Sequence, residues 1–334
     1  MNPSSDDIAE RLLKWLAVDS TSGNEREFLQ LLEGMFHDDG WQITRQPVEE
    51  DRWNLLVTDG TDPQVLLSTH VDTVPPVLEV DYDGQVVRGR GACDTKGGLL
   101  AMVHAARRVR DAGIEGVGFL LVVGEEVDHR GAKEATALQL DVDRIILCEP
   151  TQNRVVTAQK GMVRCTLRTR GVAGHSAFPD DGESAVGPLL DALEAIRGHD
   201  WPTDELLGAT TVNIGVIDAG VAANVFAPEA RAEVLFRAVS DAEQLLHEVR
   251  STVGGDVEMV DVVYNDPVFF DVPSGVDTCT VPFNTDAPYL ADIADVWLVG
   301  PGDIRCAHSE DEQIRIGEIF DGIELYEKLI QRVL

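Results

Sequence analysis

The chain has 334 residues, 44% of them apolar, and its 59 acidic and 27 basic side chains give a formal net charge of −32. The apolar fraction excludes an intrinsically disordered chain, and the length favours two domains. An acidic excess without a basic stripe argues against partners such as nucleic acid or an anionic membrane.

Lysine is scarce, with only five among the 27 basic residues. An acidic, lysine-poor surface favours a halophilic source, in which dissolved ions screen charge repulsion; an ordinary acidic protein is the alternative. The N-terminal residues lack the basic and apolar segments of a signal peptide, and no apolar stretch is long enough to span a membrane. Five scattered cysteines fit reduced thiols, so we expect a cytoplasmic protein.

The first 160 residues predict buried strands that alternate with helices. Two amphipathic helices come first, marked by apolar residues at helical spacing: Ile8, Leu12 and Leu16, then Phe28, Leu31, Leu32 and Met35. Buried strands follow at 65–69, 117–123 and 145–147, with a helix at 98–110. This alternation predicts an α/β sheet, and in such sheets ligands bind beyond the C-terminal strand ends.

The pattern changes after residue 160. We predict a strand at 162–170, a helix at 183–197, two strands at 210–217 and 230–239, a helix at 240–252 and a strand at 256–265. This order favours a ferredoxin-like α+β domain with one open sheet face. We therefore predict an α/β catalytic domain, with a mixed central sheet flanked by helices, over 1–160 and 268–334. The inserted lid or dimerisation domain covers 161–267.

Reactive side chains follow the predicted strand ends. His70 and Asp72 are two residues apart and share a strand face, so a carboxylate can fix the tautomer of a metal-binding imidazole. Asp94 precedes a helix, where it can bridge two cations or simply cap the helix. Glu125 and Glu126 can divide metal binding and proton transfer, or merely solvate a loop.

Glu149 ends a further strand, and His308 follows a glycine-rich loop, with Glu312 four residues on. Each residue alone has an ordinary structural alternative. Together the histidines and acids form a mixed nitrogen and oxygen donor set, which suits zinc, cobalt or manganese better than calcium. Cys93 and Cys148 lie beside these residues, and we interpret both as small buried hydrophobic residues rather than ligands.

The chain resembles the M20 metallopeptidase family, which includes acetylornithine deacetylase, succinyl-diaminopimelate desuccinylase, aminoacylase and glutamate carboxypeptidase. The resemblance covers nearly the whole chain and is carried by HVDTV, GRGACDTKGG, GEE, EPT, GVAGHSAFPDDGESA and GPGDIRCAHSEDE. It implies two divalent metal ions, zinc in preference to cobalt, with ligands at His70, Asp94, Glu126, Glu149 and His308. Asp94 would bridge the ions, Glu149 would share the ion of His70, and Asp72 would orient His70.

The resemblance also implies the remaining roles. Glu125 would be the general base that takes a proton from the attacking water and returns it to the leaving amine. His175 would reach the substrate oxyanion, often from the partner subunit of a homodimer formed through the lid. Asn224 and Arg237 would hold the substrate carbonyl and carboxylate. The simpler alternatives are that His175 is an ordinary turn residue and that Arg237 forms a surface ion pair.

Within the family, aminopeptidases tend to carry aspartate at the position of Glu149, which therefore favours deacylases and carboxypeptidases. FNTDAPYL and the His308 segment are similar to deacylases of amino-acid biosynthesis. The implied function is deacylation of an N-acyl amino acid such as N-acetylornithine, as in arginine biosynthesis. The alternatives are a succinyl-diaminopimelate desuccinylase, a carrier-protein lysine or ornithine hydrolase, an M20 carboxypeptidase and, remotely, a catalytically inactive binding homologue.

Overall fold

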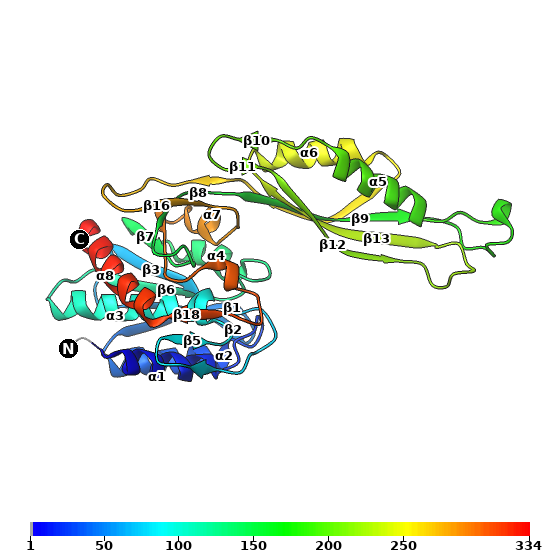
Figure 1. Ribbon diagram of the computed structural model, residues 1–334. Coiled ribbons are helices and arrows are strands. Elements are labelled where there is room, and N and C mark those ends of the chain that lie inside the picture. The colour runs from blue at the N-terminus through cyan, green and yellow to red at the C-terminus, as the bar shows by residue number, and fades with distance from the viewer. Residues whose placement is uncertain (1–2) are drawn as a thin grey trace. The chain divides into compact units, whose positions relative to one another are not determined.

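The computed structural model describes residues 3–334, which form two compact units (Figure 1). Unit 1 comprises residues 3–157, Phe270–Cys279 and Thr285–Leu334, and unit 2 comprises Ala158–Phe269 and Thr280–Asn284. The predicted fold class, an α/β domain that carries an inserted α+β domain, is confirmed. Over residues 3–334, no helix combines the length and the apolar character that crossing a membrane requires.

Unit 1 is built on a six-stranded mixed sheet with the order β1-β2-β6-β3-β7-β17. Four strands are parallel: β3 (Val65–His70), β6 (Val117–Val122), β7 (Arg144–Leu147) and β17 (Val296–Leu298). An antiparallel hairpin, β1 (Gln42–Glu49) and β2 (Arg52–Thr58), forms one edge. Every residue of β3 and β6 is buried, as the continuous apolar runs predict for strands covered on both faces.

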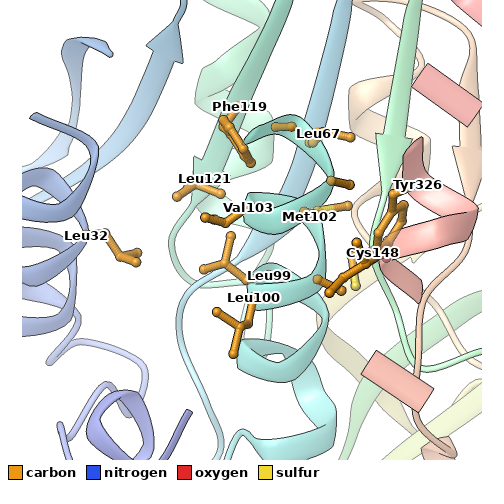
Figure 2. Packing of buried hydrophobic residues seen from close by; sticks show 14 of the residues in the cluster. Leu32, Leu67, Leu99, Leu100, Met102, Val103, Phe119, Leu121, Cys148 and Tyr326 are labelled. Atoms are coloured by element: carbon orange, nitrogen blue, oxygen red, sulfur yellow. The ribbon is translucent and has the colours of Figure 1, made fainter. Parts of the chain in front are cut away.

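Helices cover this sheet and build the larger core. They are α1 (Ser5–Leu16), α2 (Arg26–Asp38), α3 (Gly97–Asp111), α4 (Arg130–Ala135), α7 (Ala287–Leu290) and α8 (Ile316–Val333). Helices α3 and α8 pack side by side (Figure 1). Figure 2 shows Leu99, Leu100 and Val103 of α3 near Phe119 and Leu121 of β6. The buried α3 thus lies directly against the parallel strands.

The Gly97–Gly98 pair lets α3 begin close to the strand ends. A Cβ atom at Gly98 would overlap the sulfur of Cys148, and one at Gly97 would overlap the carbonyl oxygen of Ala92. Glycine is therefore required here for close approach rather than for an unusual backbone conformation. As a result, the residues before α3 lie beside the end of β7.

Unit 2 contains a four-stranded antiparallel sheet with the order β12-β13-β9-β14. Its strands are β9 (Gly161–Arg170), β12 (Thr211–Ala219), β13 (Glu229–Ala238) and β14 (Glu258–Asn265). Helices α5 (Val186–Gly198) and α6 (Ala242–Val253) lie on one face of the sheet (Figure 1). Val163, Cys165 and Leu167 of β9 join the helices in a second core, whereas Arg164 is exposed. The predicted strand and helix order is confirmed.

The other strands are short. They are β4 (Asp81–Tyr82), β5 (Val86–Arg88), β8 (Val155–Gln159), β10 (Thr203–Asp204), β11 (Gly208–Ala209), β15 (Val268–Phe269), β16 (Thr278–Val281) and β18 (Gln313–Arg315). The chain passes between the units within β8, after β15, within β16 and after Asn284. Strand β18 pairs with β5, which connects the His308 segment to the segment before α3 within unit 1.

Candidate metal centre

The five predicted metal ligands lie together at the C-terminal ends of the parallel strands of unit 1. One ligand atom each from His70, Asp94 and Glu149 lie within 4.8 Å of one another. The same holds for a second group formed by Asp94, Glu126 and His308. Because Asp94 belongs to both groups, two cation positions would share one carboxylate.

Asp94 turns each of its carboxylate oxygens toward a different histidine. Oδ1 lies 3.1 Å from Nε2 of His70, and Oδ2 lies 3.3 Å from Nε2 of His308. The His308 nitrogen is also 3.0 Å from Oε2 of Glu126. A carboxylate placed in this way can contribute one oxygen to each of two adjacent ions.

The buried charge of this cluster fits divalent cations. Burial raises the pKa of Glu149 well above its usual range, and the neighbouring Asp94 adds to the effect. Oε1 of Glu149 is buried and has no hydrogen-bond partner among residues 3–334. An uncompensated buried carboxylate is costly, and coordination to a cation removes that cost. The mixed nitrogen and oxygen donors suit zinc or cobalt.

The neighbouring carboxylates raise the pKa values of both histidines. Hydrogen bonds with Asp94 and Glu126 raise the pKa of His308 to about 10. Burial favours neutral His70, but the adjacent carboxylates of Asp72 and Asp94 outweigh it and raise the pKa of the ring. The site therefore attracts positive charge, whether as protons on the imidazoles or as metal ions.

We expect His308→Ala to bind one cation per chain where the wild type binds two. The variant lacks the only nitrogen donor of the second ligand group but keeps His70, Asp94 and Glu149. The His308 side chain is 52% exposed, so its loss should disturb packing little. Elemental analysis after metal loading measures the result, with the exposed His37→Ala as the control. Two retained ions would contradict the ligand assignment.

Asp72 contributes more than the sequence interpretation assigned to it. The ring Nδ1 of His70 makes its hydrogen bond, at 2.9 Å, with the backbone carbonyl of Asp72, while the carboxylate lies 3.6 Å away. That carboxylate instead accepts hydrogen bonds from the N–H groups of residues 124–126 and from the hydroxyl of Ser22. Asp72 thus orients His70 through its backbone and fixes the Glu125–Glu126 loop through its side chain.

Glu312 supports the shared ligand in a similar way. Its buried Oε1 accepts hydrogen bonds from the backbone N–H groups of Gly91, Cys93 and Asp94. Its Oε2 accepts a hydrogen bond of 2.6 Å from the guanidinium of Arg90. The sequence drew attention to Glu312 only through its distance from His308. Two other acids precede it directly, and nothing in the sequence distinguishes the one that is buried.

Lys96 is buried rather than solvated. Its ammonium group donates to the carbonyl oxygens of Trp15 and Val18, both at 3.1 Å, and lies 4.2 Å from the ring centroid of Phe28. Burial lowers the pKa of Lys96 to about 7. These contacts connect the end of α1 to the segment that carries Asp94.

Neither cysteine beside the site belongs to the two ligand groups. The Cys93 thiol donates to the carbonyl of Asp303 at 3.3 Å, and Cys148 packs against α3 (Figure 2). Burial raises the pKa of Cys148 to about 12, so it remains a protonated thiol. Both residues fit their interpretation as small buried side chains.

The three predicted substrate contacts lie in unit 2, at two ends of its sheet. His175 follows β9 and Asn224 follows β12, and the N–H of Ser176 donates to the carbonyl of Asn224 at 3.0 Å. Arg237 lies near the opposite end of β13, paired with the start of β9. The eight residue steps of β13 from Glu229 correspond to roughly 26 Å. Within one subunit, Arg237 is therefore far from the other two residues.

Comparison with known proteins identifies relatives over almost the whole length. The model of peptidase family M20/M25/M40 matches residues 66–332. The chain is 33% identical over 343 residues to a peptidase M20 domain-containing protein of Schizosaccharomyces pombe, covering 98% of this chain and 85% of the relative. It is 34% identical over 370 residues to a probable carboxypeptidase of Aspergillus terreus, and the match covers 95% of this chain and 84% of the relative.

Solved structures agree in fold. A tripeptidase of Staphylococcus aureus superposes with a TM-score of 0.81 at 22% identity, covering 98% of this chain and 99% of that one. An M20 family metallo-carboxypeptidase of Sulfolobus solfataricus gives a TM-score of 0.77 at 16% identity, and the superposition covers 98% of this chain and 99% of that one. At these identities the agreement concerns the arrangement of the backbone alone.

Proposed function

The chain belongs to the M20/M25/M40 peptidase family, whose members are metal-dependent hydrolases of amide bonds, and from this premise we propose that it deacylates an N-acyl amino acid such as N-acetylornithine. The observation that carries the proposal is the pair of ligand groups that share Asp94, with Glu125 on the adjoining loop. The first group is His70, Asp94 and Glu149, and the second is Asp94, Glu126 and His308. Two divalent cations, zinc in preference to cobalt, would supply Lewis acidity toward the amide carbonyl.

Glu125 would move the proton in this reaction. It belongs to neither of the two ligand groups that share Asp94, and its N–H is bonded to Asp72. Burial raises the pKa of Glu125 well above its usual range, which favours a carboxylate that can accept a proton near neutral pH. We propose that it accepts a proton from the attacking water and delivers it to the nitrogen of the leaving amino acid.

We also propose a homodimer in which each subunit supplies His175 and Asn224 to the other. The separation of roughly 26 Å along β13 supports this, because one lid cannot present both ends of its sheet to one small substrate. Strand β12 is an edge strand, and Val216 and Ile217 on it are 44% and 56% exposed. An exposed apolar edge of this kind is a surface on which a second copy can pair.

Arg237 would bind the α-carboxylate of the substrate, and we expect Arg237→Ala to raise KM about 10- to 100-fold with a smaller change in kcat. A guanidinium that binds a carboxylate contributes roughly 1.5–3 kcal/mol. The matched control is Arg231→Ala on the same strand, whose guanidinium is exposed and 3.4 Å from Asp218. Steady-state kinetics measure the effect, and an unchanged KM for every α-carboxylate substrate would contradict this role.

The second candidate function is that of a carboxypeptidase. The similarity to the probable carboxypeptidase of Aspergillus terreus favours it, and the two activities share a leaving amino acid with a free α-carboxylate. They differ only in the acyl group, which is a small acid in one case and a peptide in the other. The walls of the acyl pocket therefore decide between them.

A hydrolysis panel tests the proposal. The enzyme, loaded with zinc or cobalt, is compared on acetyl-ornithine, acetyl-citrulline, succinyl-ornithine, succinyl-diaminopimelate and several dipeptides. We propose that the charge of −32 reflects a salt-rich cytoplasm, so each reaction is run at low and at molar potassium chloride. Fastest hydrolysis of acetyl-ornithine supports the deacylase, fastest hydrolysis of dipeptides supports the second candidate, and no hydrolysis contradicts both.

A further inference from the structure

A buried histidine lies beside the proposed base. His129 is four residues after Glu125, and its side chain is 9% exposed. Its Nδ1 atom lies 2.9 Å from Oδ1 of Asp286 and 3.6 Å from Oε1 of Glu125. One ring nitrogen thus faces two carboxylates, one four residues before it in the chain and one 157 residues after it.

The backbone at His129 adopts a left-handed conformation that is uncommon for residues other than glycine. Its φ is 57°, in the left-handed region that favours glycine and asparagine. The N–H donates to the carbonyl of Gly124 at 2.9 Å, and the carbonyl accepts from the N–H of Lys133 at 3.0 Å. Because glycine or asparagine would fit this turn more easily, the imidazole ring is the feature of residue 129 that calls for a functional explanation.

Asp286 holds this ring. Its carboxylate is fully buried at the residue before α7, and Oδ2 has no hydrogen-bond partner among residues 3–334. An imidazole that carries its proton on Nδ1 donates to Oδ1 at 2.9 Å and compensates the buried carboxylate there. The ring also packs against Tyr289, with 5.2 Å between ring centroids. Contacts with Asp286 and Tyr289 thus leave the imidazole little freedom to turn.

We propose that His129 and Asp286 are a positioning pair that holds the carboxylate of Glu125 ready for proton transfer. The inference rests on the proposed function, in which Glu125 carries the proton. Asp286 fixes the ring through the 2.9 Å contact with Nδ1, which leaves the same nitrogen 3.6 Å from Oε1 of Glu125. One oxygen of each carboxylate lies within 4.8 Å of the other. Without the imidazole these carboxylates would repel, and Glu125 would lose a neighbour that restricts its rotamers.

Two other roles for this cluster make different predictions. Glu125, His129 and Asp286 could hold an additional cation, since their ligand atoms meet the same 4.8 Å limit. In that case removing the imidazole lowers the metal content. The ring could instead serve only to pack the loop against α7. In that case stability falls, but a free imidazole cannot restore activity.

His129→Gly and His129→Asn test the proposal. Glycine accepts the left-handed backbone and leaves a space that free imidazole can enter. Asparagine tolerates the same backbone and places an amide donor near the position of Nδ1. We expect His129→Gly to keep its metal content and KM but to lose kcat roughly tenfold to a hundredfold, the scale of a misplaced catalytic group. Added imidazole should restore part of this kcat, and His129→Asn should retain more of it.

The outcomes separate the possibilities. A wild-type kcat in His129→Gly overturns the proposal, and so does a loss of metal from that variant. The proposal is also overturned if kcat falls in His129→Gly and is neither restored by added imidazole nor better retained in His129→Asn. Asp286→Asn, which keeps the size of the side chain, should lower kcat without altering metal content; an unchanged kcat would also overturn the proposal. Glu125→Gln is measured in parallel. If it keeps full turnover, the proposed base itself is wrong; if it is inactive while His129→Gly is normal, only the positioning pair is wrong.

Discussion

Glu125→Gln should retain both cations and hydrolyse its substrate roughly 10²–10⁴ times more slowly than the wild type, the usual contribution of a general base. Glutamine preserves the shape of the side chain but cannot accept a proton. The backbone N–H at residue 125 still bonds to Asp72, so the loop should stay in place. Single-turnover kinetics and elemental analysis on the same preparation measure the two properties separately.

The matched control for this variant is Glu134→Gln. Glu134 is an exposed acid on α4, nine residues further along the chain, and its backbone carbonyl accepts a hydrogen bond from the side chain of Gln46. It should leave turnover unchanged. Near-normal hydrolysis by Glu125→Gln would show that another group accepts the proton, and loss of metal would show that Glu125 is a ligand.

Asp94→Ala should abolish stoichiometric metal binding and reduce hydrolysis to background. Asp94 is the one residue common to both ligand groups, so its loss weakens both cation positions at once. The two imidazoles that face its oxygens would then lie next to each other without the carboxylate between them. This sets Asp94 apart from His308, whose removal should affect a single position.

Isothermal titration with zinc measures the loss, and Asp311→Ala is the control. Asp311 is an exposed acid in the His308 segment whose backbone N–H bonds to Ser309. The control should bind two equivalents with wild-type affinity. Wild-type stoichiometry in Asp94→Ala would refute the shared bridge, even if activity were lost.

The sequence was sufficient for the parts of unit 1 that have a continuous apolar signature. Strands β3 and β6 are buried along their whole length, and the strands predicted at 65–69 and 117–123 correspond to them closely. The hairpin of β1 and β2 was not predicted. Strand β1 lies at the sheet edge without a buried residue, so its sequence lacks the apolar run that marks an inner strand.

Each candidate ligand lies inside a short motif, so the sequence alone was enough to single it out, whereas the hydrogen bonds that Asp72 and Glu312 make could not be predicted. Asp72 reaches residues 124–126, and Glu312 bonds to the segment before α3 more than two hundred residues away. Such contacts depend on the fold and have no local pattern. In a chain with 59 acidic residues, a buried carboxylate that accepts hydrogen bonds looks in sequence like one on the surface.

The lid shows a second limit of sequence reasoning. Motif similarity grouped His175, Asn224 and Arg237 as contacts of one substrate, but the register of β9 with β13 separates Arg237 from the other two along the sheet. A linear sequence does not say which copy of the chain supplies a residue. The family resemblance suggested a partner subunit for His175, and the separation along β13 in unit 2 is the structural argument for the proposed homodimer.

Anomalous diffraction from zinc-loaded crystals tests most directly whether a pair of cations shares Asp94. Data collected on both sides of the zinc absorption edge should show two peaks per chain, both in contact with Asp94. One should also contact His70 and Glu149, and the other Glu126 and His308. A single peak in fully loaded crystals, or two peaks of which one does not touch Asp94, would contradict the account.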